Sequence, residues 1–371
     1  MYSYWEKQDW FEHYEFVIVG AGIVGLTTAY YLNKYCPGNK ILVIDRHFIP
    51  SGASTKNAGF SCFGTVGEIL DDLETVSRQE VINTIRLRWN GLNRLKEIHT
   101  PDIIEYMNRG GYEVFTEEES FEFCLDKVTE VNDIMEEAIG ISHVFKIEDC
   151  LWSNKLVSRC ISNALESELN PVRMIKNLIT MLRKSHNIDF LFGLRLNKEQ
   201  FNYEGKHIRI SKDMNIAYEK LMLCTNAFSG DLINELDLTP YRNQVIVSEV
   251  LQNVPFSGTF HYDKGYVYFR EIHGRLLIGG ARNIDPATER TSEFGSNLLI
   301  IEELKRFAAE IILQKEVKFD FQWSGIIATG SSKKPILKSV NDHTFLAARL
   351  GGMGVAIGSE LAWELTEKVI A

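Results

Sequence analysis

One short stretch near the N-terminus, EFVIVGAGIVG, constrains the fold more than any other part of the chain. Residues 15–19 form a nearly all-apolar run rich in Phe, Val and Ile, which is typical of a parallel strand buried on both faces. Gly20, Gly22 and Gly25 follow with the spacing G-x-G-x-x-G, and residues 23–35 have the periodicity of a helix. The glycines therefore stand where a strand turns directly into a helix, as in a dinucleotide-binding unit.

A physical requirement explains why glycine stands at each of these three positions. Gly20 permits the tight turn, Gly22 lets the backbone approach a pyrophosphate, and Gly25 lets the helix pack closely on the strand. The free N–H groups and the positive end of the helix dipole then face the phosphates. A second apolar run, residues 41–44, ends in Asp45, whose carboxylate can accept hydrogen bonds from ribose hydroxyls. This order of elements favours a nucleotide site over an ordinary glycine-rich turn.

The length and the net charge of the chain limit the classes of protein to which it can belong. Its 371 residues predict two domains, or one large α/β domain with an inserted second one. A net charge of −10 argues against a nucleic-acid partner, because such affinity comes largely from basic patches. We see neither a membrane span nor a signal peptide. The six cysteines include no C-x-x-C pair, so we expect reduced thiols and a cytoplasmic protein.

Helical and extended patterns alternate along the rest of the chain. We expect helices at residues 66–99 (two helices), 117–139, 171–186, 296–313 and 359–369. We expect strands in a hairpin at 103–116, in a meander at 188–196, 206–211 and 220–225, in an antiparallel region at 244–281, and at 344–350. Small residues fill 51–64, which predicts a loop that lines a ligand.

Five stretches, in this order, resemble the D-amino-acid oxidase superfamily of FAD-dependent oxidoreductases, which includes glycine oxidase, sarcosine oxidase and γ-glutamylputrescine oxidase. They are VIVGAGIVGLTTAYYL, GASTKNAGF, GRLLIGGARN, WSGIIATGSSKKPIL and LGGMGVAIG. The resemblance runs from residue 15 to the C-terminus. It implies an α/β protein with a Rossmann-type FAD-binding domain and an inserted α+β substrate domain built on a mixed or antiparallel sheet. The FAD-binding domain is then expected to be discontinuous, at residues 1–100, 150–235 and 320–371, and the substrate domain at 101–149 and 236–319.

The resemblance also implies which residues hold the cofactor, FAD. The expected contacts are Gly20, Gly22, Ile23, Val24 and Gly25 at the pyrophosphate; Asp45 and Arg46 at the adenosine; Leu196, Thr225 and Asn226 near the adenine; Ser54, Thr55, Asn57, Ala58 and Gly59 along the ribityl chain; and Gly351, Gly352, Met353, Gly354 and Val355 at the flavin N1 and C2=O. The last set would place a helix N-terminus against a ring that carries negative charge at N1 when reduced. Sarcosine oxidase attaches its flavin to a Cys that would align near Gly325, and residues 325–337 contain none. Non-covalent FAD is therefore expected.

Members of this superfamily transfer hydride from a C–H bond next to nitrogen to flavin N5, and the imine product hydrolyses. Because the flavin carries this chemistry, we assign no catalytic acid or base, and nothing in the sequence resembles a metal site. Members that bind a substrate carboxylate use an Arg two residues after the glycine of W-x-G. Here that position is Ile327, which cannot form a bidentate pair with a carboxylate. The expected pocket residues are Phe60, Tyr266, Tyr268, Arg270 and Ile327.

Several alternatives stay open for the pocket. Tyr266, Tyr268 and Arg270 share one strand face by their spacing of two, so the tyrosines either line the pocket or make cross-strand packing. Arg270 either replaces the missing carboxylate-binding Arg or is an ion-paired residue of the sheet. His261 and His273 are expected in loops or turns without a catalytic role.

Three functions are consistent with these observations. The first is oxidation of an amine or amino acid, the second is FAD-dependent oxidation of a 2-hydroxy acid or polyol, and the third is a non-catalytic flavoprotein that serves binding or assembly. Sarcosine oxidase activates oxygen with a Lys where this chain has Leu277, and glycine oxidase lacks that Lys too. The electron acceptor is therefore either O2 or another carrier, and the substrate and the oligomeric state are left open.

Overall fold

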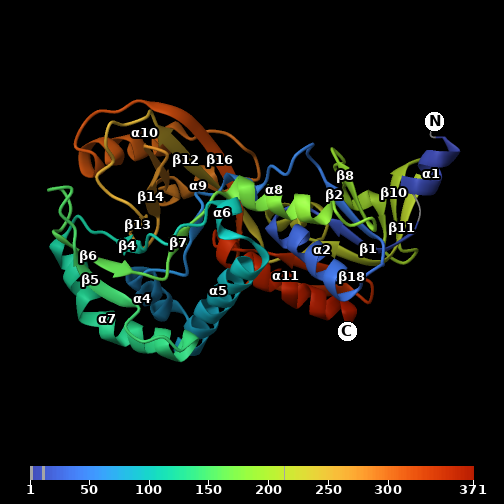
Figure 1. Ribbon diagram of the computed structural model, residues 1–371, viewed down its shortest axis with the longest axis horizontal. Helices are drawn as coiled ribbons and strands as arrows, with labels where there is room; N and C mark the ends of the chain where they lie inside the picture. The colour runs from blue at the N-terminus through green and yellow to red at the C-terminus, as the bar shows by residue number, and fades with distance from the viewer. Residues whose placement is uncertain (1–2, 11–12, 213) are drawn as a thin grey trace. The chain divides into compact units, whose positions relative to one another are not determined.

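The computed structural model describes residues 3–10, 13–212 and 214–371 (Figure 1). The chain divides into two compact units, each made from more than one segment. Unit 1 comprises Met1–Thr55, Val172–Pro240 and Ile327–Ala371, and unit 2 comprises Lys56–Pro171 and Tyr241–Ile326.

Unit 1 is built on a parallel sheet. Its central strand β1 (His13–Val19) pairs in parallel with β2 (Ile41–Asp45) on one side and with β11 (Met214–Leu223) on the other. The strand β8 (Ile188–Phe192) continues the sheet beyond β2, and β18 (Thr344–Ala348) continues it beyond β11. The apolar runs of β1 and β2 are buried, as expected where both faces of a parallel sheet are covered. The strands predicted around the G-x-G-x-x-G segment are confirmed.

Antiparallel strands extend this sheet at two places. The strand β17 (Ile336–Asn341) pairs with β18. The first half of β11 pairs with β10 (His207–Ser211), which in turn pairs with β9 (Phe201–Asn202). The predicted meander is wrong in one respect, because β8 pairs in parallel with β2 and not with β10. The local pattern predicted each strand but not its partner.

Two helices of unit 1, α2 (Ile23–Tyr35) and α11 (Gly354–Ile370), lie side by side (Figure 1). They approach closely at Gly358, where a Cβ would come within 2.7 Å of the Ile23 side chain. The helix predicted at 359–369 begins five residues earlier than expected, because the glycine-rich stretch before it hides the helical periodicity. Other helices of unit 1 are α1 (Tyr4–Trp10), most of the short α3 (Ala53–Lys56), and α8 (Pro171–Leu182), which begins at the last residue of the first segment of unit 2.

Unit 2 contains a mostly antiparallel eight-stranded sheet. Its strands, in spatial order, are β16 (Phe319–Thr329), β12 (Thr239–Ser248), β15 (Arg275–Gly280), β14 (Val267–Ile272), β13 (Thr259–Tyr262), β4 (Gly111–Glu113), β6 (Arg159–Asn163) and β5 (Phe145–Asp149). Only the pair of β4 and β13 is parallel among the described pairings. The helix α10 (Leu298–Phe307) packs on one face and buries Phe269 and Ile278 in a common core. The predicted antiparallel region and the α+β character are confirmed.

The hairpin predicted at 103–116 is wrong. The segment begins as a short helix, α6 (Pro101–Ile104), and its single strand β4 pairs with β13 and β6. Both partners are distant in the sequence, so the Gly-Gly pair at 110–111 joins no two neighbouring strands.

Three helices of unit 2 pack on one another: α4 (Val66–Thr75), α5 (Arg78–Ile98) and α7 (Glu118–Ile139) (Figure 1). Ser77 and Glu80 form a capping box at the start of α5, which separates it from α4 and confirms the two predicted helices. A two-stranded sheet joins β3 (Phe60–Ser61) to β7 (Ser167–Glu168).

The compact units differ from the expected domain boundaries in four segments. Two are short: residues 236–240, expected in the substrate domain, lie in unit 1, and residues 320–326, expected in the FAD-binding domain, lie in unit 2. The two longer segments, 56–100 and 150–171, also expected in the FAD-binding domain, lie in unit 2. The first of these two packs through α4 and α5 on α7, and the second forms β6 and β7. None of the helices in the described part of the chain combines the length and apolar character needed to cross a membrane.

Two hydrogen bonds that join α7 to β5 allow a test of how this contact stabilises the fold. Buried Asn132 accepts a hydrogen bond from Phe145 N at 2.8 Å and donates one to Phe145 O at 3.0 Å. Replacing Asn132 by Ala leaves both backbone groups without these partners, so we expect a loss of about 2–4 kcal/mol in the free energy of unfolding. Urea denaturation measures this loss.

The matched control is Asn90→Ala on the exposed face of α5, for which we expect a change below about 0.5 kcal/mol. Equal unfolding midpoints for the two variants would contradict the structural role of Asn132.

Candidate functional site

The turn after β1 in unit 1 is the G-x-G-x-x-G segment. Gly20 has a φ of +109°, and a Cβ there would lie 2.5 Å from the carbonyl oxygen of Cys224. A Cβ at Gly25 would overlap the carbonyl oxygen of Gly20. Gly20 therefore requires glycine because the segment after β11 approaches the turn, and Gly25 requires it because the start of α2 packs directly on the end of β1.

The N-terminus of α2 lies at this turn. Gly22 is the N-cap and has no side chain with which to cap the helix. Ser54 Oγ accepts a hydrogen bond from Ile23 N at 2.9 Å, and Thr55 Oγ1 donates to backbone carbonyls of its own loop. Val24 is buried within the helix. The first amides of α2 and the positive end of its dipole suit this turn to an anionic group such as a phosphate.

Asp45, the last residue of β2, lies against the same turn. Its Oδ2 accepts a hydrogen bond from Ala21 N at 2.8 Å, and its Oδ1 accepts one from His47 N at 3.0 Å. The neighbouring Arg46 places its guanidinium 3.6 Å from the ring centroid of Phe228. Burial lowers the pKa of Arg46 from its ordinary value, and the charge of Asp45 opposes this shift. The structure thus brings the acid predicted from the sequence to the glycine turn.

A second helix N-terminus in unit 1 follows the Gly351–Gly352 pair. Both glycines have a positive φ, of 58° and 86°, and the N-cap of α11, Met353, makes no side-chain capping bond. Val355 is buried in the first turn. The position of Gly352 lies 3.8 Å, measured to an added Cβ, from Cδ1 of Ile327. Ile327, which is 8% exposed, therefore lies beside the loop expected to face the flavin.

Three further predicted residues lie in unit 1. Leu196 is buried in the core beneath the parallel sheet. Thr225 follows β11, and its hydroxyl shares a hydrogen bond with Ser229 at 3.0 Å. Asn226 has a φ of +46°, and its Oδ1 accepts a hydrogen bond from Arg349 N at 3.0 Å. Asn226 therefore joins the ends of β11 and β18.

The remaining predicted residues lie in unit 2, beginning with the loop at 57–59. Asn57 Oδ1 accepts a hydrogen bond from Gly59 N at 2.8 Å. Gly59 has a φ of +75°, and its carbonyl accepts a hydrogen bond from Leu169 N at 2.8 Å. Ala58 packs in a small apolar cluster with Leu277 on the sheet. The loop thus has a fixed backbone supported by the sheet behind it.

An aromatic group follows this loop. The ring of Phe60 makes edge contacts with Tyr268, at 5.6 Å between centroids, and with His261, at 5.4 Å. Burial raises the pKa of Tyr268 to about 12. Tyr266 is 36% exposed and lies beneath the guanidinium of Arg282, so it does not share the buried environment of Tyr268. Both the pocket role and the cross-strand role of Tyr268 are compatible with these contacts.

Arg270 is buried, and its guanidinium group contacts two neighbouring residues. Its Nη2 donates to the carbonyl of Leu169 at 3.1 Å, and its Nη1 lies 3.4 Å from Glu168 Oε2. Arg109 Nη1 lies 2.9 Å from the other oxygen of Glu168. Burial lowers the pKa of Arg270, while Glu168 opposes this shift. Within the described residues, Arg270 is thus the ion-paired arginine of the sheet that we considered as one alternative.

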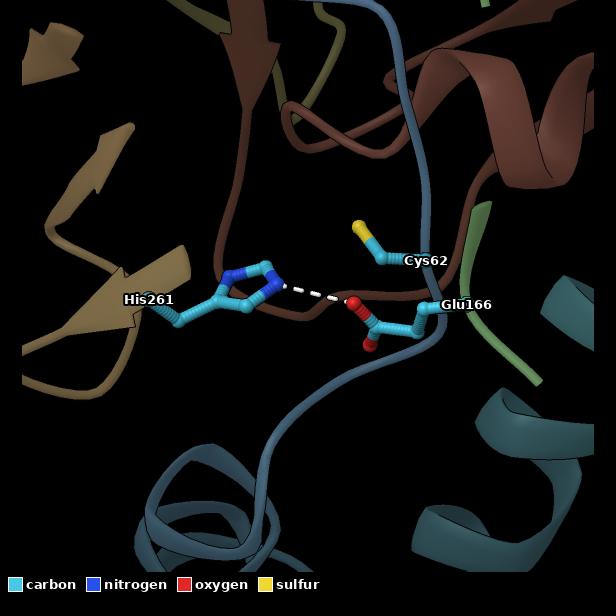
Figure 2. A group of neighbouring side chains, drawn as sticks. All are labelled: Cys62, Glu166 and His261. Atoms are coloured by element: carbon cyan, nitrogen blue, oxygen red, sulfur yellow. Dashed lines mark hydrogen bonds and ion pairs between the residues drawn. The ribbon is translucent and has the colours of Figure 1, made fainter. Parts of the chain in front are cut away.

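A buried polar group in unit 2 has no counterpart among the residues predicted from the sequence. Cys62, Glu166 and His261 come from separate segments and lie together, with the imidazole of His261 directed at Glu166 (Figure 2). The hydrogen bond between His261 Nε2 and Glu166 Oε2 is 2.9 Å long. Our assignment of His261 to a loop or turn is wrong, because it lies in β13; His273 does lie in a turn. No local spacing relates these residues, since 95 positions separate Glu166 from His261.

Burial and mutual charge shift the pKa values of this group. Burial is the largest single influence on His261 and lowers its pKa, but Glu166, Glu113 and Glu68 together outweigh burial, so the pKa of His261 is raised. Burial raises the pKa of the Cys62 thiol well above its ordinary value. Nearby Glu113 accepts hydrogen bonds from Thr65 Oγ1 at 3.0 Å and Gly67 N at 3.1 Å. Burial is the largest influence on Glu113 and raises its pKa to about 7.

A family model matches this chain over nearly its whole length. Residues 15–368 match the model of the family described as "FAD dependent oxidoreductase". No curated protein matches the sequence significantly.

Solved structures with the same fold cover nearly the whole chain. L-proline dehydrogenase from P. horikoshii has a TM-score of 0.76 at 16% identity, over 96% of this chain and 93% of that one. Glycine oxidase from Geobacillus kaustophilus has a TM-score of 0.74 at 16% identity, over 96% and 95%. L-α-glycerophosphate oxidase from Mycoplasma pneumoniae, solved with FAD bound, has a TM-score of 0.72 at 13% identity, over 97% and 95%.

The raised pKa of Glu113 predicts a pH effect on stability. Its folded-state pKa of about 7 exceeds the ordinary value of 4.5, so the folded state binds this proton more tightly than the unfolded state. Stability associated with Glu113 is therefore present at low pH and decreases as pH rises between these two values. Glu113→Gln removes the titration, so its stability relative to the parent should rise by about 3 kcal/mol across this range.

Denaturant unfolding of both proteins, near the ordinary carboxyl pKa and at about pH 8, measures this difference. The control is Glu136→Gln on the exposed side of α7, for which the difference should not vary with pH. Parallel stability profiles of Glu113→Gln and the parent would exclude the pKa shift.

Proposed function

Because the chain belongs to the family of FAD-dependent oxidoreductases, we propose that it oxidises a small amine or amino acid at a C–H bond next to nitrogen. Similar folds include proteins named L-proline dehydrogenase and glycine oxidase, which supports this substrate class. FAD, held by the residues of unit 1, would supply the acceptor for the hydride of that bond, and the imine product would hydrolyse in water.

The residues of unit 1 fit a dinucleotide. The glycines at 20, 22 and 25 keep the backbone of this turn accessible, and Ile23 N already donates to Ser54 Oγ, so a pyrophosphate would accept from other amides of the first turn of α2. Asp45 lies at the position from which a carboxylate can accept from the ribose. We propose that the N-terminus of α11, after Gly351 and Gly352, stabilises negative charge on the flavin.

We further propose that unit 1 is the FAD-binding part and unit 2 the substrate-binding part. The loop of Asn57, Ala58 and Gly59 would then continue the cofactor contacts with a backbone already ordered by its own hydrogen bonds. The rings of Phe60 and Tyr268 would supply an apolar wall that excludes water from the reacting carbon. No acid or base is assigned, because an amine that enters neutral needs none. FAD is proposed to be non-covalent.

The proposed substrate class rests mainly on the presence of an isoleucine at position 327. This buried, apolar side chain lies beside Gly352, where carboxylate-binding members of the resembling superfamily have an arginine. Arg270 is already engaged by Glu168 and Leu169, so using it for a substrate carboxylate would cost those contacts. We therefore favour an amine whose carboxylate is absent or is not bound by arginine.

A second candidate keeps the cofactor and changes the substrate. The similar fold of a protein named L-α-glycerophosphate oxidase supports oxidation of a hydroxyl-bearing carbon in a 2-hydroxy acid or polyol. The electron acceptor, O2 or another carrier, is part of neither proposal. A non-catalytic flavoprotein is the third possibility, and the same experiment separates all three.

The experiment is anaerobic reduction of the bound flavin by matched pairs of compounds. Each pair contains an amino acid and the amine that lacks its carboxylate, and a parallel set contains 2-hydroxy acids and polyols. We expect loss of the flavin absorbance with the amines, at least about tenfold faster than with the amino acids, because Ile327 offers no bidentate partner. Released ammonia, or the smaller amine from a secondary amine, should match the flavin reduced.

Reduction by hydroxy acids or polyols alone would replace the proposal with the second candidate. A flavin that no compound reduces, although dithionite does, would support the non-catalytic protein. Faster reduction by the amino acids would contradict the argument from Ile327 while leaving amine oxidation in place.

The proposed role of Asp45 can be tested by cofactor binding. Asp45→Ala removes a ribose acceptor and the bond to Ala21 N, so we expect the dissociation constant for FAD to rise by about 10–100-fold. Asp45→Asn keeps one acceptor oxygen, so its dissociation constant for FAD should lie between those of the parent and of Asp45→Ala. Titration of the FAD-free protein, followed by flavin fluorescence, gives the constants.

Glu204→Ala, in an exposed turn of unit 1, is the control and should bind FAD like the parent. If Asp45→Ala folds and binds FAD with unchanged affinity, Asp45 does not hold the cofactor.

A further inference from the structure

Three side chains that can ligate a metal meet inside unit 2 (Figure 2). Cys62 directly follows β3, Glu166 precedes β7, and His261 lies in β13. The sulfur, one carboxylate oxygen and one ring nitrogen all lie within 4.8 Å of one another. All three residues are buried, with exposed fractions of 7%, 1% and 6%. This arrangement comes from tertiary packing alone, because three distant segments supply one residue each.

The surroundings of this cluster are rich in carboxylates. Glu113 and Glu68 lie close enough to affect His261 electrostatically. Arg88, whose charge influences Cys62, is held by Glu68 at 3.0 Å and by the carbonyl of Phe63 at 3.0 Å. Thr259 Oγ1 donates to Glu166 at 3.1 Å and so orients the carboxylate. A region of this composition attracts a cation, and a hydrogen-bonded carboxylate is a ligand already in position.

The distances allow one ion to contact all three side chains. Two ligand atoms on a tetrahedral zinc ion lie about 3.3–3.7 Å apart, given bond lengths of about 2.0–2.3 Å. The 2.9 Å contact between His261 and Glu166 would widen and the separation from Cys62 would shorten. Each side chain would need to move by about 1 Å or less, which side-chain torsions can supply.

We propose that Cys62, Glu166 and His261 bind one divalent transition metal ion of the zinc class. Thiolate, imidazole and carboxylate together suit zinc, which accepts both soft and harder ligands. On binding, the thiol of Cys62 loses its proton to solvent, and the proton shared by His261 and Glu166 leaves as the imidazole donates to the metal. Two protons are exchanged for one ion of charge +2, so the net charge of the buried cluster does not change.

Three protein ligands leave the fourth position of a tetrahedral ion for water or for an added ligand. The ion would also tie β3, the segment before β7 and β13 to one centre. Through β3 this centre adjoins Phe60, the aromatic residue that contacts His261. The proposal does not depend on the amine-oxidising function, because binding of the ion is measured directly.

The test uses the full-length, FAD-loaded protein after treatment with a chelator and dialysis. Zn2+ binding is measured by calorimetry and by elemental analysis after gel filtration. Co2+ is a second probe, because tetrahedral Co2+ absorbs at wavelengths longer than flavin does, and a thiolate ligand adds a charge-transfer band. We expect one ion per chain, the spectrum of a tetrahedral thiolate site, and a higher unfolding temperature in the presence of Zn2+.

Cys62→Ser is the main variant, because it keeps the hydrogen bond between His261 and Glu166. Its affinity for Zn2+ should fall by at least about tenfold, and the Co2+ charge-transfer band should disappear. Glu166→Gln should weaken binding as well. The matched control is Cys160→Ala, another buried cysteine of unit 2 outside the cluster, which should bind like the parent.

Two results would overturn the proposal. One is a parent protein that retains no stoichiometric Zn2+ and shows no tetrahedral Co2+ spectrum. The other is a Cys62→Ser variant that binds Zn2+ as tightly as the parent, because the ion would then be held elsewhere. In the first case Glu166 and His261 form a buried ion pair only.

Discussion

The architecture of unit 1 depends on the close approach of α2 to the end of β1. A side chain at Gly25 would overlap the carbonyl of Gly20, so the approach exists only with glycine. Parallel strands place their carboxyl ends at one edge of a sheet, and the segments that follow them therefore meet there. Hydrogen bonds confirm this for two pairs of segments, Ala21 with Asp45 and Asn226 with Arg349. One packing constraint thus sets the positions of several backbone groups suited to a nucleotide.

Unit 2 depends on charges that are buried in pairs. The segment 166–168 carries two buried carboxylates, which are held by His261 on β13 and by Arg270 on β14. Taking such groups out of water costs several kcal/mol for each ion, which only close partners offset. These pairs fix the segment against the sheet, and the next residue, Leu169, bonds to the carbonyl of Gly59. The loop at 57–59, which is expected to follow the cofactor, is therefore supported by a segment that ion pairs hold in place.

The sequence predicts local elements well and distant partners poorly. The strand and helix around Gly20 follow from periodicity and glycine spacing, which act over a few residues. The hairpin around Gly110 is wrong because β4 pairs with strands more than 40 residues away, which no local pattern reports. The contacts of Arg270 and the cluster of Cys62, Glu166 and His261 have the same origin. The family resemblance extends prediction to the cofactor residues. It does not identify the substrate, because Ile327 departs from the arginine that carboxylate-binding members have at this position.

Gly358 is not among the residues proposed to bind FAD, yet α11 lies against α2 at this position, where a Cβ would come within 2.7 Å of the side chain of Ile23. The two helices begin at the loops proposed for the pyrophosphate and for the flavin ring, so the way they pack on each other affects the distance between these loops. A larger residue at this position would meet the side chain of Ile23 in the first turn of α2 and would force the two helices to repack. If unit 1 binds FAD as proposed, a residue remote from the cofactor thus influences the distance between its pyrophosphate and flavin sites.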